Sequence, residues 1–185
     1  VQTCALPISF KGLHSFLKLA IAKKLKDFPI HIKLDTGMHR LGFQAADVAQ
    51  LSAILKDNPH VKVKSILSHL AASDDLELMD FTLHQIEQFE NMSAALITDL
   101  GYAPIRHLLN TSGISNFTNA QYDMVRLGIG LYGISNDTEE QKFLAVVGTL
   151  KSVISQIRLL NEGDSVGYGR RFMATKPTKV ATIPI

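Results

Sequence analysis

Residues 31–43 read HIKLDTGMHRLGF, and this stretch decides which fold the chain is expected to adopt. Polar and apolar side chains alternate at its start, a pattern typical of a β-strand, and Lys33 lies within that strand. The pattern is broken by Asp-Thr-Gly at residues 35–37, and Arg40 follows shortly after. These residues alone admit three interpretations: the catalytic turn of an aspartic protease, a cofactor-binding turn of an α/β barrel, or an ordinary loop.

The sequence on both sides of this stretch alternates between helical and strand patterns. Apolar residues recur at steps of three and four in three segments, and apolar runs bounded by turn residues separate those segments. We therefore expect helices at residues 9–27, 45–57 and 81–101, and strands at residues 30–34, 61–71, 105–112 and 123–134. Strands that alternate with helices pair in parallel as βαβ units, so this part of the chain is predicted to be α/β.

The pattern changes after about residue 140. Residues 147–160 alternate with a period of two, and short strand patterns follow at residues 165–172 and 179–185. Such a pattern is typical of antiparallel β-structure. We predict that a boundary near residues 136–143 separates part of a βα-repeat domain from the start of a β domain.

Composition excludes several classes of protein. The chain has 185 residues, 46% hydrophobic and 19% charged, as expected of a soluble globular protein. The net charge of +2 gives no strong attraction for nucleic acid or an anionic membrane, and no apolar run approaches the roughly 20 residues that span a bilayer. Cys4 is the only cysteine, so we expect no disulfide framework and no cysteine-based metal site, which fits a cytoplasmic location.

Both ends of the sequence are abrupt. Residues 1–8, VQTCALPI, reverse-translate into the end of a common sequencing adapter, so we expect them to be foreign and exclude Cys4 from functional reasoning. The source codons at these positions test this expectation. The other end stops inside an apolar strand pattern at Ile185. We therefore expect the chain to be an internal fragment of a longer protein.

Polar side chains occur where each predicted parallel strand ends. They are Ser68-His69, residues 110–113 (Asn-Thr-Ser-Gly), and Arg126 with the following Gly-Ile-Gly at 128–130. In βα barrels the active site is built at the C-terminal ends of the strands, and glycines there let backbone N–H groups approach a phosphate. Taken singly, these residues are also consistent with a core histidine, an edge-strand arginine and an ordinary turn.

Six segments in this order resemble the alanine racemase family. KLDTGMHRLGF, SHLAASDD, HLLNTSGI and DMVRLGIGLYGI resemble its barrel, while GDSVGYGRRFMA and KVATIPI resemble the opening of its C-terminal β domain. The resemblance covers nearly everything from Ser9 to Ile185. It implies the second half of a TIM-type (β/α)8 barrel at residues 9–138, followed by the first strands of an all-β C-terminal domain at residues 139–185.

The resemblance also implies a function. The family uses pyridoxal 5'-phosphate to interconvert L-alanine and D-alanine for peptidoglycan synthesis, as a cytoplasmic homodimer. The sequence of the barrel segments is most similar to that of the Bacteroidetes-type enzyme, in which the racemase is fused behind a MurF-type ligase. A non-catalytic pyridoxal-phosphate-binding barrel remains the alternative, and so does the aspartic protease, although the helices between the strands argue against the latter.

Site residues follow by motif match. Arg40 would hold the phenolic oxygen of the cofactor and approach the substrate carboxylate, and Lys33 would be carbamylated and would brace Arg40. Arg126 would donate to the pyridine nitrogen, with His69 near both the ring and this arginine. Thr111 stands where the family usually has serine, and would bind the phosphate with two backbone N–H groups. The expected cofactor-binding set is Arg40, His69, Asn110, Thr111, Arg126, Gly128 and Ile129, with no metal.

Two residues of the family pattern have no counterpart in the sequence. The lysine that carries the cofactor belongs to the first half-barrel, and the tyrosine base would begin one or two residues beyond Ile185, from where it reaches across the dimer. Racemisation needs a base on each face of a planar carbanion. We therefore predict that residues 1–185 are inactive alone.

Overall fold

The computed structural model describes residues 4–185. The first three residues of the stretch predicted to be foreign, 1–8, lie outside the described residues. The chain divides into two compact units, of which the first runs to Val146 and the second spans Val147–Ile185.

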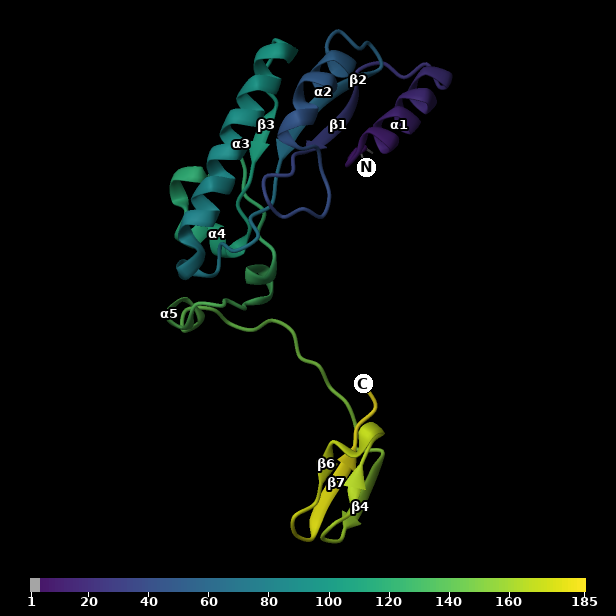
Figure 1. The fold of residues 1–185 in the computed structure, drawn as a ribbon, viewed down its shortest axis with the longest axis vertical. Coiled ribbons are helices and arrows are strands. Elements are labelled where there is room, and N and C mark those ends of the chain that lie inside the picture. The colour runs from purple at the N-terminus through teal and green to yellow at the C-terminus, as the bar shows by residue number, and fades with distance from the viewer. Residues whose placement is uncertain (1–3) are drawn as a thin grey trace. The chain divides into compact units, whose positions relative to one another are not determined.

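The first unit alternates between strands and helices (Figure 1). Its strands are β1 (Phe28–Lys33), β2 (Val61–Leu67) and β3 (Ile105–His107). Its helices are α1 (Phe10–Ala22), α2 (Val48–Leu55), α3 (Met79–Leu100), α4 (Thr111–Asn116) and α5 (Thr138–Gln141). Short 3-10 turns cover Ala45–Asp47, Leu76–Leu78, Thr118–Ala120 and Ile129–Tyr132. No helix formed by residues 4–185 combines the length and the apolar character that crossing a membrane requires.

The three strands form one parallel sheet in the order β1-β2-β3. This confirms the parallel βαβ arrangement expected from the first three strand patterns. The pairing of β1 with β2 shifts register once, because Ile30 lies opposite Val63 whereas His31 lies opposite Ser65. Lys64 is therefore an extra residue in β2, which is a β-bulge.

Apolar side chains of the strands meet those of the helices in a single core. Ile30, Ile32 and Ile66 are fully buried on the sheet, because alternate residues of a strand point to the same face. The helices complete this core with Leu13, Leu17, Leu51, Leu55, Phe89, Met92 and Leu96. The three predicted helices, α1, α2 and α3, thus bury apolar side chains at the three- and four-residue spacing of their sequence.

Local signals in the sequence fix the helix ends. The Ser9 side chain accepts a hydrogen bond from the Gly12 N–H at 3.3 Å, which satisfies one of the free donors at the start of α1. At the C-terminal end of α3, Gly101 adopts a left-handed conformation with φ of 73°, which glycine allows at little cost. The end of α3 thus agrees with the helix expected at residues 81–101.

The strand predicted at residues 123–134 is wrong. Met124 forms one isolated bridge with His107, and the segment then turns into the 3-10 helix Ile129–Tyr132. The N–H groups of Gly128 and Gly130 both donate to the Thr111 hydroxyl, at 3.0 and 3.2 Å, and not to a neighbouring strand. Glycines without side chains to pack, combined with this competing acceptor, favour a turn over a ladder.

The second unit is antiparallel, as its sequence pattern predicted. β4 (Gln156–Leu160) pairs with β7 (Thr178–Thr182), and β5 (Ser165–Val166) pairs with β6 (Phe172–Met173) around a 3-10 turn at Tyr168–Arg170. The strand pattern at residues 147–160 is realised only in β4. The apolar residues that precede β4, Val147, Leu150 and Val153, are exposed and do not contribute to a core within this unit.

Gly42 allows the loop after β1 to return against the end of that strand. The Phe43 N–H donates to the Lys33 carbonyl at 2.9 Å, and the Asp35 N–H donates to the Phe43 carbonyl at 2.8 Å. Gly42 has a φ of +121°, and an added Cβ would lie 2.9 Å from the backbone of residues 33–35. Both the conformation and the close approach therefore require glycine.

We predict that Gly42→Ala destabilises the chain by roughly 2 kcal/mol or more, because the strained φ and the backbone contact cannot both relax. Gly12→Ala is the matched control, since a Cβ at that helical position meets only the Ser9 side chain, at 3.6 Å. That substitution should stabilise by about 0.5–1 kcal/mol. Urea unfolding of the two variants gives the comparison, and similar effects of both would contradict the assignment.

Candidate functional site

Six of the predicted site residues line one cavity at the C-terminal end of the sheet. The cavity has a volume of about 320 Å³. Its lining is His69, Asp74, Asn110, Thr111, Ser112, Arg126, Leu127, Gly128, Ile129 and Asn136. The seventh predicted residue, Arg40, is exposed and does not line this cavity. Polar groups that are scattered in the sequence thus come together because parallel strands end at the same edge.

Arg126 is half-buried and holds the ends of β2 and β3. Its Nη1 donates to the Nδ1 and the carbonyl of His107, at 2.6 and 3.1 Å. Its Nη2 donates to the carbonyls of Ser68 and Leu108, at 2.6 and 3.0 Å, and lies 3.2 Å from the Nδ1 of His69. These contacts use both terminal nitrogens of the guanidinium.

The Nε–H of Arg126 makes no hydrogen bond within residues 4–185. A guanidinium has five N–H donors and no acceptor, so the Nε–H is the donor left for a ligand. Burial lowers the pKa of Arg126, but an arginine keeps its proton across the physiological range. Arg126 therefore gives the cavity a fixed positive charge and one available donor.

His107 is a site residue that the sequence patterns did not identify. It is 5% exposed, and burial, the charge of Arg126 and the nearby His31 ring lower its pKa to about 4. Burial and the charge of Arg126 also lower the pKa of His69. Both imidazoles are thus neutral near pH 7 and can accept hydrogen bonds from Arg126. The signal for His107 was a polar residue inside the strand pattern 105–112.

Thr111 and Asn110 organise another part of the cavity wall. Thr111 accepts hydrogen bonds from Gly128 and Gly130, so the Gly128 N–H that was predicted to bind phosphate already has an acceptor. The Ile129 N–H between them has no acceptor within residues 4–185. The Asn110 side chain accepts from the Gly113 N–H at 3.1 Å and caps α4. Its amide oxygen therefore has a structural task at the edge of the cavity.

Lys33 lies at the end of β1 and is only 9% exposed. Burial and the charges of Arg126 and Arg40 lower its pKa, and Asp35 opposes this shift. Arg40 also lowers the pKa of His69, so its charge acts on the same region although its side chain is exposed. Three basic side chains therefore share one end of the sheet, which favours an anion among them.

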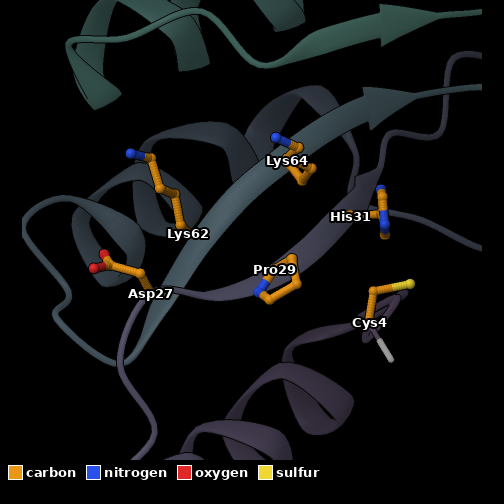
Figure 2. Close-up of a pocket in the computed structure, with 6 residues that line it drawn as sticks. All are labelled: Cys4, Asp27, Pro29, His31, Lys62 and Lys64. Atoms are coloured by element: carbon orange, nitrogen blue, oxygen red, sulfur yellow. The ribbon is translucent and has the colours of Figure 1, made fainter. Parts of the chain in front are cut away.

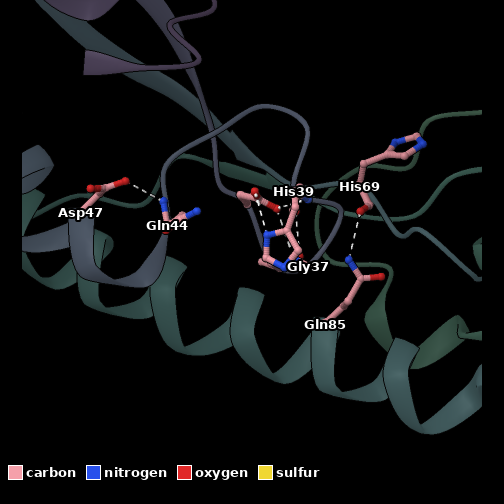
Figure 3. Close-up of polar contacts among 9 residues, drawn as sticks. Gly37, His39, Gln44, Asp47, His69 and Gln85 are labelled. Carbon is pink, nitrogen blue, oxygen red and sulfur yellow. Dashed lines mark hydrogen bonds and ion pairs between the residues drawn. The ribbon is translucent and has the colours of Figure 1, made fainter. Parts of the chain in front are cut away.

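The Asp-Thr-Gly run forms the turn that leads to Arg40. The Asp35 carboxylate accepts from the N–H groups of Gly37 and His39, at 3.2 and 3.0 Å, and lies 3.4 Å from the His39 ring (Figure 3). Burial raises the pKa of Asp35, but these N–H groups and His39 outweigh it and leave the pKa below its usual value. The Thr36 and Ser68 hydroxyl groups form a hydrogen bond of 2.8 Å. The carboxylate thus has a structural role in this turn.

Gln85 of α3 fixes the loop after β2 and was also missed by the sequence patterns. It is fully buried, its amide donates to the His69 carbonyl at 3.3 Å, and its carbonyl accepts from the Ala71 N–H at 2.9 Å (Figure 3). A glutamine on the apolar face of a predicted helix was the available signal. Its effect is to place the backbone that carries the His69 imidazole.

The parallel βα units, the polar groups gathered where they end and the antiparallel unit that follows define a barrel-type α/β protein with a C-terminal β domain. The family model for the alanine racemase N-terminal domain matches residues 11–136, and that for the C-terminal domain matches residues 147–185. The chain belongs to the alanine racemase family. The predicted fold class, part of a TIM-type barrel followed by β-structure, is confirmed.

Individual relatives agree. The alanine racemase of Syntrophobacter fumaroxidans is 34% identical over 158 residues, which are 84% of this chain and 42% of that protein. A crystal structure of alanine racemase from Bartonella henselae, with covalently bound pyridoxal phosphate, is 29% identical with a TM-score of 0.67 over 97% of this chain and 48% of that one. The biosynthetic enzyme from Pseudomonas aeruginosa is 28% identical with a TM-score of 0.72, over 98% and 49%. The chain thus spans less than half the length of these relatives.

We predict that the chain loses stability as the pH falls from about 6.5 to about 4. In this range the unfolded chain binds a proton at His107 that the folded chain does not, so acid favours unfolding. The shift corresponds to roughly 3 kcal/mol at most, and the lowered pKa of His69 adds to it. The charged groups that oppose protonation of His107 are Arg126 and, once it is protonated, His31.

Urea unfolding at several pH values measures this dependence. His107→Gln keeps polar character without titrating, so its stability should fall less steeply with acid than that of the unmodified chain. Parallel pH curves for the two proteins would show that His107 is not the group responsible.

Proposed function

We propose that the chain is part of a pyridoxal-phosphate-dependent alanine racemase that interconverts L-alanine and D-alanine. The observation that carries this proposal is the cavity in which Arg126, His69, Thr111 and the Ile129 N–H converge after the parallel strands. Family membership over both units supports it, as does the covalently bound cofactor in the Bartonella henselae relative.

The residues of the cavity fit this cofactor. A dianionic phosphate needs hydrogen-bond donors, and the Thr111 hydroxyl proton and the Ile129 N–H supply two of them at one wall. Gly130 packs closely against Thr111, since an added Cβ would lie 2.7 Å from the Thr111 methyl group. This part of the wall therefore has no room for a side chain at residue 130. The Nε–H of Arg126 can donate to a ring nitrogen.

Arg126 sets the electronic character of the proposed site. Bound pyridoxal phosphate supplies an electron-withdrawing ring that stabilises negative charge at the α-carbon of an amino acid. Arg126 has no proton to give up near pH 7, so it donates to the ring nitrogen and leaves that nitrogen unprotonated. This limits electron withdrawal, which suits proton exchange at the α-carbon better than further reactions. His69 contacts Arg126 and would border the ring.

Lys33 is proposed to carry a carbamate that braces Arg40. The lowered pKa of Lys33 favours the neutral amine, which is the form that adds to carbon dioxide. The product is an anion among Arg40 and Arg126, where an unmodified lysine would add a third positive charge. Arg40 would then face the phenolic oxygen of the cofactor and the substrate carboxylate.

The remaining parts of the proposal rest on the family resemblance. We propose that residues 9–138 belong to the barrel and 139–185 to the β domain, that the whole protein acts in the cytoplasm as a homodimer in peptidoglycan synthesis, and that a MurF-type ligase precedes it. Residues 1–185 contain neither proposed base, so we expect this chain alone to be inactive. The alternatives are less well supported, since a cofactor carrier does not explain the match to the C-terminal racemase domain.

We predict that the whole protein containing residues 9–185 forms D-alanine from L-alanine with added pyridoxal phosphate, and that Arg126→Ala reduces the rate by about 100-fold or more. Chiral analysis of the product measures the rate, and the absorbance of bound cofactor reports occupancy. Residues 1–185 assayed alike should give no D-alanine. A whole protein that binds the cofactor without racemising alanine would favour the non-catalytic carrier.

Arg40 and Asp35 separate the racemase from the protease interpretation. Arg40→Ala in the whole protein should impair cofactor and substrate binding, whereas Asp35→Asn keeps the oxygen that accepts from Gly37 and His39 and should have a much smaller effect. Cofactor dissociation constants and the KM for alanine are the measurements. Equal losses in the two variants, or a larger loss for Asp35→Asn, would count against the roles assigned to them.

A further inference from the structure

A line of hydrogen bonds crosses the sheet from His31 to Arg126. The His31 Nδ1 lies 2.6 Å from the Ser65 hydroxyl, and this hydroxyl lies 3.0 Å from the Nε2 of His107. The other ring nitrogen of His107 lies 2.6 Å from Arg126. The residues come from β1, β2, β3 and the segment after β3, so each strand contributes one member.

The β-bulge makes this line continuous. Because Lys64 is the extra residue, Ser65 lies opposite His31, and His107 is within reach of Ser65 on the next strand. Ser65 is 2% exposed and His107 is 5% exposed, so these polar groups have little access to water as an alternative partner. Buried polar groups that bond in series are held in one arrangement.

The chemistry of Arg126 fixes the direction of every bond in the line. A guanidinium only donates, so the Nδ1 of His107 must accept. Neutral His107 then carries its proton on Nε2 and donates to Ser65. The Ser65 hydroxyl, which accepts from His107, directs its own proton to the Nδ1 of His31. A His31 protonated on Nδ1 would leave that hydroxyl proton without an acceptor.

We propose that Ser65 and His31 are positioning residues that act through His107 to hold the Arg126 guanidinium at the wall of the cavity. All hydrogen bonds of this line have one direction, from Arg126 to His31. The line anchors Nη1, and the carbonyls of Ser68 and Leu108 anchor Nη2, so that Nε–H stays free. The inference rests on the proposed function only for the cofactor that Arg126 would contact. The line itself is a property of the chain.

His31 forms the far end of the line and borders a second cavity of about 330 Å³ (Figure 2). The charged groups there are Asp27, at the start of the β1 segment, and Lys62 and Lys64 of β2. The direction of the line requires the His31 Nδ1 to accept from Ser65, which places the His31 proton on Nε2.

The test is the tautomeric state of the two histidines, read from ¹⁵N chemical shifts of the imidazole nitrogens in the 185-residue chain near pH 7. We expect His107 and His31 each to show a single tautomer, with the proton on Nε2. His107→Gln and His31→Gln identify the signals among the seven histidines. The experiment contains no cofactor, so its outcome is separate from failure of the proposed function.

Ser65 variants show whether the hydroxyl transmits the direction. In Ser65→Ala, His31 should change to a mixture of tautomers and the His107 Nε2–H should lose its protection from exchange with water, whereas Ser65→Thr should restore both. Ser52→Ala is the matched control, since the Ser52 hydroxyl is buried and has no partner within residues 4–185. If Ser65→Ala fails to fold, Ser65→Thr and Ser65→Val make the same comparison with side chains of equal shape.

Two results would overturn the proposal. One is a His107 with its proton on Nδ1 in the unmodified chain, because Arg126 could not then be its donor. The other is a folded Ser65→Ala or Ser65→Val in which the His31 tautomer is the same as in Ser52→Ala.

Discussion

The constraint on which the site depends is the partial burial of a guanidinium that has no carboxylate partner within residues 4–185. Arg126 is held by three backbone carbonyls and two imidazoles. These groups satisfy the donors of its two terminal nitrogens but leave its positive charge unneutralised, and that charge acts on its neighbours. It lowers the pKa of Lys33, His69 and His107, so the arginine determines the protonation states around it. A region organised in this way favours ligands that bring negative charge.

The backbone around this charge is fixed by side chains that bond to it, and of these only Thr111 also has a proposed role in binding. Gln85 holds the loop after β2 from the helix side, Asp35 holds the turn after β1, and Thr111 holds the glycine turn that follows Arg126. Each satisfies backbone groups that the end of a strand leaves unpaired. The cavity wall is therefore formed by loops whose hydrogen bonds are already made. Such loops can present the remaining donors without rearrangement.

The sequence was informative where one residue or one period determines the structure. The helical periods and the parallel strands were predictable, as was the gathering of His69, Thr111 and Arg126 at one edge. The turn at residues 128–133 was not, because the decisive hydroxyl of Thr111 comes from a distant part of the chain. The roles of Ser65 and His107 also depended on strand register, which a pattern of alternation does not specify.

The bulge at Lys64 has a consequence for how this segment can vary in length. A strand normally cannot lose a residue without turning every later side chain to the opposite face. Here Val63 and Ser65 already occupy consecutive positions opposite Ile30 and His31, with Lys64 supernumerary between them. A chain lacking Lys64 would keep both halves of the strand in register, with Ser65 still opposite His31. Loss of Ser65 would instead place Lys64 opposite His31 and remove the hydroxyl from the line. A one-residue gap between Val63 and Ser65 in an alignment would therefore indicate a relative in which this strand lacks the bulge, and not a change of loop length.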